Sequence, residues 1–295
     1  MARNVSRLHE QRGRPRGRDA FDEDPSLDPG LPDPGEDLPR GGRRRRGIYL
    51  LPNSFTAAAL FAGFYAVVMA MGHHYERSAT AIFAAMVLDS LDGRVARLTH
   101  TQSEFGAHFD SLADMVSFGA APALVMYQWS LHSLGKLGWL AAFVYCAGAA
   151  LRLARFNTNI GVVDKSYFQG LPSPAAAGLV GGFLWVLSDA QVRGADIAWG
   201  AFAVTAFAGM SMVTNVPFYS FKAVSLRRSV PFITLFLIVL LIGLIAYRPP
   251  AVLFGLFFLY ALSGYGLYLW RRLHGGSVSV ISTSTDEPDE RGLHG

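Results

Sequence analysis

Eight long apolar stretches alternate with short polar connections between Gly47 and Leu273. Six of them are clear apolar segments with charged residues only near their ends, whereas two carry acidic residues inside an otherwise hydrophobic sequence. Each approaches or reaches the ~20 residues that a helix needs to cross ~30 Å of hydrocarbon. The stretches are residues 49–71, 77–98, 106–130, 136–157, 173–190, 197–213, 230–247 and 250–270. The pattern therefore predicts an all-α, polytopic membrane helix bundle.

The two ends of the chain differ from this apolar region in composition. Residues 1–46 are rich in Arg, Asp, Pro and Gly and hold 11 of the 26 Lys and Arg residues. A segment of this kind cannot bury enough apolar surface to offset its ordering entropy. We expect a disordered, charged tail at 1–46, a second disordered tail at 274–295, and no cleaved signal peptide.

The distribution of positive charge predicts an orientation in the membrane. Eight crossings place both termini on the same side, and a cytoplasmic N-terminus leaves few basic residues in the opposite loops, which is the positive-inside pattern. Those few are Arg77, Lys136, Arg193 and Arg248. The basic cluster Arg43–Arg46 fits either a topology signal or a contact with anionic headgroups. We therefore expect both termini to be cytoplasmic, and the net charge of +4 gives no indication of nucleic-acid binding.

The acidic residues inside two of the apolar stretches indicate chemistry. Asp89 and Asp92 are three positions apart, and Asp110 and Asp114 are four apart, so each pair lies on one helix face. Each such carboxylate costs at least ~2.5–3.5 kcal/mol in a membrane, and the two nearby arginines are too few to neutralise them. Bound Mg²⁺, Mn²⁺ or Ca²⁺ would neutralise them, because hard cations prefer oxygen ligands. Interhelical salt bridges and a cation pathway through a transporter are the alternatives.

Residues 89–114 read D-x2-D-G-x2-A-R-x8-G-x3-D-x3-D, which resembles the signature of the CDP-alcohol phosphotransferase family at every position. The resemblance implies a six-helix catalytic core, a homodimer, a CDP-linked lipid donor, an alcohol acceptor and two divalent ions, Mg²⁺ or Mn²⁺. We expect that core at 47–213 and two additional transmembrane helices at 214–273.

The same resemblance implies roles for individual residues. Asp89, Asp92, Asp110 and Asp114 would bind metal, and Asp114 would also act as the base for the acceptor hydroxyl. The residues that would hold the CDP-lipid are Asn53, Thr56, Gly93, Ala96, Arg97 and Ser103. Asn53 and Thr56 are also common residue types at the start of a helix, so their presence after Pro52 has a simpler explanation as well.

Four further segments, outside the motif, resemble the bacterial and archaeal CDP-diacylglycerol–serine O-phosphatidyltransferases of this family. These segments are residues 51–56, 117–123, 152–157 and 168–175. The resemblance implies transfer of the phosphatidyl group from CDP-diacylglycerol to L-serine in the bacterial inner membrane, with release of CMP at the cytoplasmic face. Candidate serine-binding residues are Ser117, Arg152, Arg155 and Asn157.

Alternatives remain for these assignments. The two arginines, Arg152 and Arg155, fit positive-inside anchoring equally well. Glycerol 3-phosphate, inositol phosphate or choline are alternative acceptors, and an ion-coupled transporter is the alternative outside the family.

Overall fold

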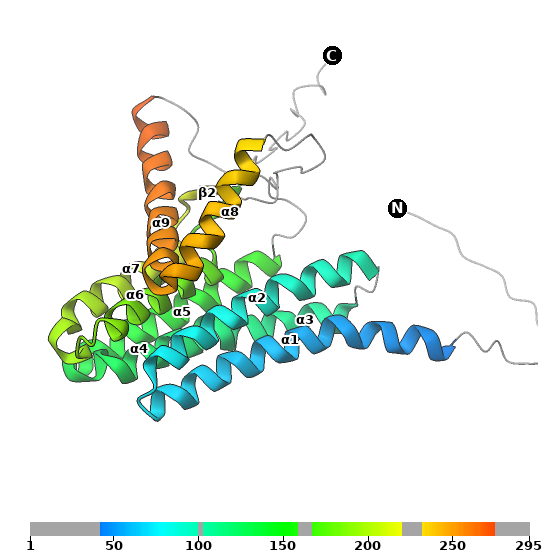
Figure 1. The fold of residues 1–295 in the computed structure, drawn as a ribbon, viewed down its shortest axis with the longest axis horizontal. Helices are drawn as coiled ribbons and strands as arrows, with labels where there is room; N and C mark the ends of the chain where they lie inside the picture. Colours follow the sequence, from blue (N-terminus) through cyan, green and yellow to red (C-terminus); the bar gives the residue numbers. More distant parts are fainter. Residues whose placement is uncertain (1–41, 100–102, 159–166, 220–231, 275–295) are drawn as a thin grey trace, which may run out of the picture. The chain divides into compact units, whose positions relative to one another are not determined.

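The computed structural model of this protein describes residues 42–99, 103–158, 167–219 and 232–274 (Figure 1). Most of the two predicted tails lies outside these residues. The first helix begins at Gly42, so the last five residues of the predicted N-terminal tail have helical backbone. We describe below the unit that contains Arg44–Gly295.

Helices make up most of the described chain. Each of the eight apolar stretches coincides with a helix or with a run of helical segments, so the predicted all-α class is confirmed. The elements of the first half are α1 (Gly42–Met71), α2 (Tyr75–Thr99), α3 (Glu104–Asp114), η1 (Met115–Ala120), α4 (Ala121–Trp129), η2 (Leu131–Leu134) and α5 (Lys136–Thr158). Those of the second half are α6 (Ser173–Asp189), η3 (Gly194–Ile197), α7 (Ala198–Val213), α8 (Phe232–Tyr247) and α9 (Pro249–Leu273).

A short β-ribbon interrupts this helical pattern. Strand β1 (Tyr167–Gln169) pairs antiparallel with β2 (Pro217–Tyr219), and Phe168 lies opposite Phe218. The sequence analysis missed this ribbon, because three residues are too few to show the alternation of a strand. The ribbon connects the segment before α6 with the segment after α7.

Among the described residues, five helical spans are long and apolar enough to cross a membrane. They are Pro52–Met71, Glu104–Trp129, Lys136–Thr158, Gly194–Val213 and Pro249–Trp270. Helix α2 carries the acidic residues inside its apolar sequence, and α6 and α8 are shorter, at 17 and 16 residues. The protein is therefore a multi-pass membrane protein, and the count of eight crossings stays a prediction.

Small residues allow the helices of the core to approach closely. Helix α5 packs along α7, where a Cβ added to Gly209 would lie 2.7 Å from the Cα of Tyr145, and Gly148 faces the Gly209 carbonyl. Helix α9 packs on α6, where Gly178 lies against the ring of Phe257. Close backbone approach of this kind drives helix association in membranes, because apolar burial gives no advantage over lipid.

We predict that Gly148→Ala destabilises the fold, because the new methyl group would overlap the backbone of α7. Overpacking of this kind costs about 1–3 kcal/mol. Thermal unfolding in detergent would measure the effect. Gly255→Ala is the matched control, since nothing lies within 4 Å of its added Cβ. Equal unfolding temperatures for the two variants would contradict the close α5–α7 contact.

Candidate active site

Three carboxylates from α2 and α3 converge. Oxygen atoms of Asp89, Asp92 and Asp110 all lie within 4.8 Å of one another. Asp92 is buried, and the other two side chains are half-buried. The spacing along the two helices predicted that each pair would share a face, and the packing of α2 near α3 brings three of the four carboxylates to one point.

Asp114, the fourth predicted member, lies one turn beyond Asp110 and outside this group of three. It interacts electrostatically with Asp89 and Asp110 on one side and with Arg152 of α5 on the other. The backbone changes from α- to π-helix directly after Asp114. Short π-helical segments are rare and occur frequently at functional sites. The geometry leaves Asp114 at the edge of the carboxylate group, next to a cation.

Helix α1 contributes to the site through a hydrogen bond. The Thr56 hydroxyl donates to Oδ2 of Asp92 at 2.8 Å, and the Thr56 side chain is 4% exposed. We predicted Thr56 as a residue that holds the CDP-lipid. That role stays a prediction, whereas the structure shows that Thr56 orients one of the three clustered carboxylates, which the sequence analysis did not foresee.

A pocket of about 190 Å³ opens beside the carboxylates. Residues of α1, α2 and α3 line it, together with the residue that precedes α3. Five of the six predicted CDP-lipid residues are among them. The lining residues are Pro52, Asn53, Thr56, Asp92, Gly93, Ala96, Ser103, Gly106, Ala107 and Asp110.

The two glycines of the pocket differ in their surroundings. A Cβ added to Gly93 would meet nothing within 4 Å, so this position leaves open space beside Asp92. A Cβ on Gly106 would lie 3.1 Å from Oγ of Ser103 and 3.2 Å from Oδ1 of Asn53. Gly106 therefore allows α3 to approach α1 closely.

Two of the predicted CDP-lipid residues have local structural partners. Ser103 caps the N-terminus of α3, since its Oγ accepts a hydrogen bond from the Gly106 amide at 3.0 Å. Arg97 is exposed, its Nε donates to the Gly93 carbonyl at 2.9 Å, and it does not line the pocket.

The four candidate serine-binding residues occupy different surroundings. Ser117 is 1% exposed and donates to the Ala59 carbonyl at 3.1 Å, which joins η1 to α1. Arg155 donates to the Val213 carbonyl at the end of α7. Asn157 donates to the hydroxyl of Ser111, next to Asp110, at 3.1 Å. These three side chains therefore have structural partners.

Arg152 differs from the other candidates. Its Nη1 donates to the Ser173 hydroxyl at 2.6 Å, and its Nε is buried with no hydrogen-bond partner in the described part of the chain. It interacts electrostatically with Asp114 and with Tyr260 of α9. The sequence analysis did not single out Ser173, because that residue lies between two prolines in a segment noted only for its resemblance. Arg152 thus has an unsatisfied donor and interacts electrostatically with a carboxylate of the site.

The model of the CDP-alcohol phosphatidyltransferase family matches residues 49–216, which contain the carboxylates and the pocket. The chain belongs to this family. A CDP-diacylglycerol–serine O-phosphatidyltransferase of Helicobacter pylori is 36% identical over 228 residues, which cover 76% of this chain and 92% of the relative. Enzymes of the same name from Methanocaldococcus jannaschii and Saccharomyces cerevisiae are 37% and 38% identical over 144 and 139 residues. Those matches cover 49% and 42% of this chain and 65% and 50% of the relatives.

The carboxylates of this family member could bind a divalent metal. Their donor atoms are all oxygen, which suits hard ions such as Mg²⁺ or Mn²⁺ better than zinc. One carboxylate oxygen from each of the three aspartates lies within 4.8 Å of the other two, which is close enough for one ion to contact several of them. The residues present therefore fit the metal dependence of the family.

We predict that Thr56→Val weakens metal binding about 10- to 100-fold, the usual cost of losing a partner that orients a metal-binding carboxylate. The substitution removes the hydrogen bond to Asp92 with little change in side-chain volume. Equilibrium dialysis with Mn²⁺ would measure the affinity. Thr56→Ser keeps the hydroxyl and should stay close to wild type. Unchanged affinity in Thr56→Val would show that this hydrogen bond does not orient a ligand.

Proposed function

We propose that this protein synthesises phosphatidylserine by transferring the phosphatidyl group of CDP-diacylglycerol to L-serine. The observation that carries the proposal is the group of Asp89, Asp92 and Asp110 beside a pocket lined by residues of the family motif. The names of the relatives support serine as the acceptor.

In the proposed reaction, Asp114 accepts the proton of the serine hydroxyl. The serine oxygen then forms a bond to the phosphorus that carries diacylglycerol, and the bond from this phosphorus to CMP breaks, so that CMP leaves. Asp89, Asp92, Asp110 and Asp114 would hold two Mg²⁺ or Mn²⁺ ions. When bound, such ions stabilise negative charge on the attacking and leaving oxygens.

The CDP part of the donor would occupy the pocket between α1, α2 and α3. Asn53 and Ser103 offer polar atoms at its wall, and Gly93 leaves space there. Ala96 adds only a methyl group to the same wall. Arg97, which lies outside the pocket, would pair with a phosphate from its mouth, because a guanidinium can contact a phosphate through two parallel hydrogen bonds.

The serine carboxylate would bind Arg152. This side chain has a buried Nε without a partner among the described residues, and it interacts with Asp114. A carboxylate held there would leave the serine hydroxyl on the side of the proposed base. The hydrogen bond that Nη1 of Arg152 donates to the Ser173 hydroxyl would hold the guanidinium in place.

The orientation of the protein follows from its charge pattern. We propose eight membrane crossings in the bacterial inner membrane, with both termini and the carboxylates on the cytoplasmic side. Both a cytidine nucleotide and L-serine are polar molecules that reach the site from water. We also propose a homodimer, on the resemblance alone.

We predict that purified protein releases CMP from CDP-diacylglycerol only when L-serine and Mg²⁺ or Mn²⁺ are present, and that a chelator stops the release. Asp114→Asn should lower turnover about 10²- to 10⁴-fold, because it removes the proposed base. The same variant should still bind CDP-diacylglycerol. This binding is measured in a separate experiment without serine, so that no reaction takes place.

Other outcomes of this assay would discriminate between the alternatives. Release that requires glycerol 3-phosphate, inositol phosphate or choline would keep the family and replace the acceptor. Absence of release with every alcohol would favour a transporter.

We predict that Arg152→Lys raises the KM for L-serine about 10-fold or more, because charge-assisted hydrogen bonds contribute about 1.5–3 kcal/mol. The KM for CDP-diacylglycerol should stay unchanged. Arg155→Lys is the matched control, since Arg155 lies on the same helix and its Nη1 binds the end of α7. A fall in kcat with an unchanged KM for serine would assign Arg152 to the chemistry rather than to acceptor binding.

A further inference from the structure

A second and larger cavity, of about 560 Å³, lies at the opposite ends of the helices from the aspartates. The turn between α1 and α2 lines it, as do the end of α4, the end of α6 and the start of η3. We call it the distal cavity; its polar lining includes His73, Glu76, Arg77, Ser188, Gln191 and Arg193. Sixteen residues of α2 separate Glu76 from Asp92, which is about 24 Å at 1.5 Å per residue. The distal cavity is therefore separate from the catalytic pocket.

Two walls of the distal cavity have the same unusual backbone. His73 lies two residues after the end of α1 and has φ 60°, and Gln191 lies two residues after the end of α6 and has φ 55°. The amide of His74 donates to the Met69 carbonyl and that of Val192 to the Leu187 carbonyl, so both helices close with the same motif. Glycine is the usual residue at this position, because a side chain disfavours positive φ.

His73 and Gln191 are the non-glycine residues with clearly positive φ in the described part of the chain, and both line this one cavity. A polar side chain at such a position carries a conformational cost. Strained residues of this kind cluster at sites that bind ligands. Ser188, on the same wall, has a buried hydroxyl without a hydrogen-bond partner among the described residues. The two side chains at positive φ have local partners, since Nδ1 of His73 lies 2.8 Å from the Tyr75 hydroxyl and Nε2 of Gln191 donates to the Ser188 carbonyl at 3.1 Å. The unpartnered Ser188 hydroxyl is therefore the observation on these walls that points to a polar ligand.

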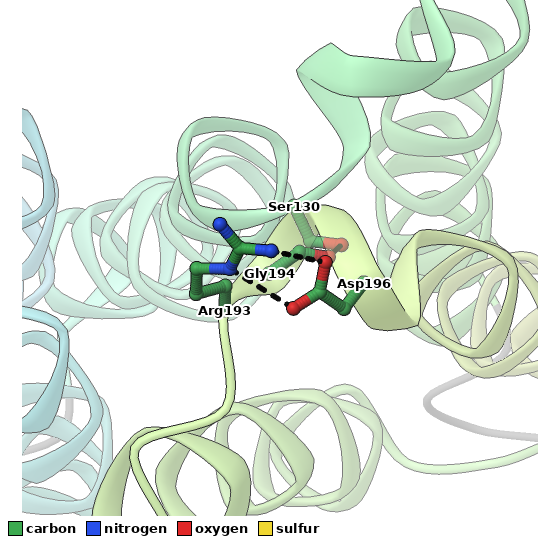
Figure 2. A network of polar contacts seen from close by, with 4 residues as sticks. All are labelled: Ser130, Arg193, Gly194 and Asp196. Carbon is green, nitrogen blue, oxygen red and sulfur yellow. Dashed lines mark hydrogen bonds and ion pairs between the residues drawn. The ribbon is translucent and has the colours of Figure 1, made fainter.

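The wall formed by η3 carries an exposed ion pair between Arg193 and Asp196. Nε and Nη2 of Arg193 each donate to Asp196 at 3.0 Å, which leaves Nη1 turned away from the carboxylate (Figure 2). These hydrogen bonds raise the pKa of Arg193 further above its ordinary value. The Ser130 hydroxyl donates to the Gly194 carbonyl at 2.6 Å, which anchors the start of η3 to the end of α4 (Figure 2). Asp196 thus orients the Arg193 guanidinium, and Ser130 fixes the backbone of the following residue.

The charges of the distal cavity indicate the chemical class of its ligand. Arg77 forms no ion pair with any described residue, so two guanidinium groups have donors to offer. Guanidinium groups match the oxygens of a phosphate. Glu76 lies beside Arg77 and offers a carboxylate to an ammonium group. The volume falls within the ~300–1,000 Å³ of typical ligand sites.

We propose that the distal cavity is a second, non-catalytic site that binds a phosphate ester carrying an ammonium group, the chemistry of phosphoethanolamine. Arg77 and Arg193 bind the phosphate, and Glu76 binds the ammonium. The ester reaches the site either as a phospholipid headgroup or as a free molecule.

Calorimetric titration of the full chain in a phosphate-free detergent would test this site. A chelator removes metal from the aspartates, which suppresses phosphate binding at the catalytic pocket. The probes are dihexanoyl-phosphatidylethanolamine, O-phosphoethanolamine and inorganic phosphate. We expect saturable binding of at least one ester, and a Kd raised at least 10-fold in the double variant Arg77→Gln, Arg193→Gln. Lys136→Gln is the matched control, because this exposed base does not line the cavity and should leave the Kd unchanged.

A further variant separates binding from folding. Ser188→Ala removes a buried hydroxyl that has no hydrogen-bond partner among the described residues, so it should keep or raise the unfolding temperature while weakening the binding of the ester several-fold. Binding of the lipid alone would identify a headgroup, and binding of both esters a soluble ligand; both outcomes support the site. Absence of saturable binding, an unchanged Kd in the double arginine variant, or equally tight binding of inorganic phosphate would overturn the proposal.

Discussion

A carboxylate in an apolar helix raises the free energy of the folded chain unless cations or hydrogen-bond donors surround it. A divalent cation bound where α1, α2 and α3 meet would satisfy this constraint. Asp89 and Asp92 on α2 reach Asp110 on α3, and the Thr56 hydroxyl on α1 donates to Asp92. A single polar cluster therefore joins three helices whose other faces are apolar, and the pocket beside it lies between the same three helices. The catalytic site and the packing of this end of the bundle depend on the same interactions.

Close packing of the remaining helices places the second half of the site. Glycine contacts between α5 and α7 allow these helices to touch along their backbones. Arg152 of α5 then reaches both the Ser173 hydroxyl at the start of α6 and the surroundings of Asp114. Helix α9, which lies outside the core matched by the family, packs on α6 and brings Tyr260 into the electrostatic range of Arg152. The C-terminal helices thus contribute to the surroundings of the proposed acceptor site.

The two ends of the helices differ in what they carry. At one end, acidic side chains gather and are suited to bind metal. At the other, two arginines and two helix ends with polar residues at positive φ surround the distal cavity. A metal-dependent transferase acts on phosphates at the first end, whereas the phosphate site that we propose at the second end uses arginines and no metal. The length of α2 keeps the two sites apart, so binding at one end can be studied without blocking the other.

The sequence by itself determined the helical class, the eight apolar segments and the motif aspartates, because hydrophobic periodicity and residue spacing are local properties. Through its resemblance to the family, it also pointed to five residues that line the pocket between α1, α2 and α3. Only the tertiary structure decided that Thr56 binds Asp92, that Ser117 is buried against α1, and that Arg152 keeps an unsatisfied donor. These contacts depend on which helix packs against which. The sequence pattern does not show the distance in space between side chains that are far apart in the chain. The distal cavity escaped prediction for the same reason, because its walls come from four separate turns and helix ends.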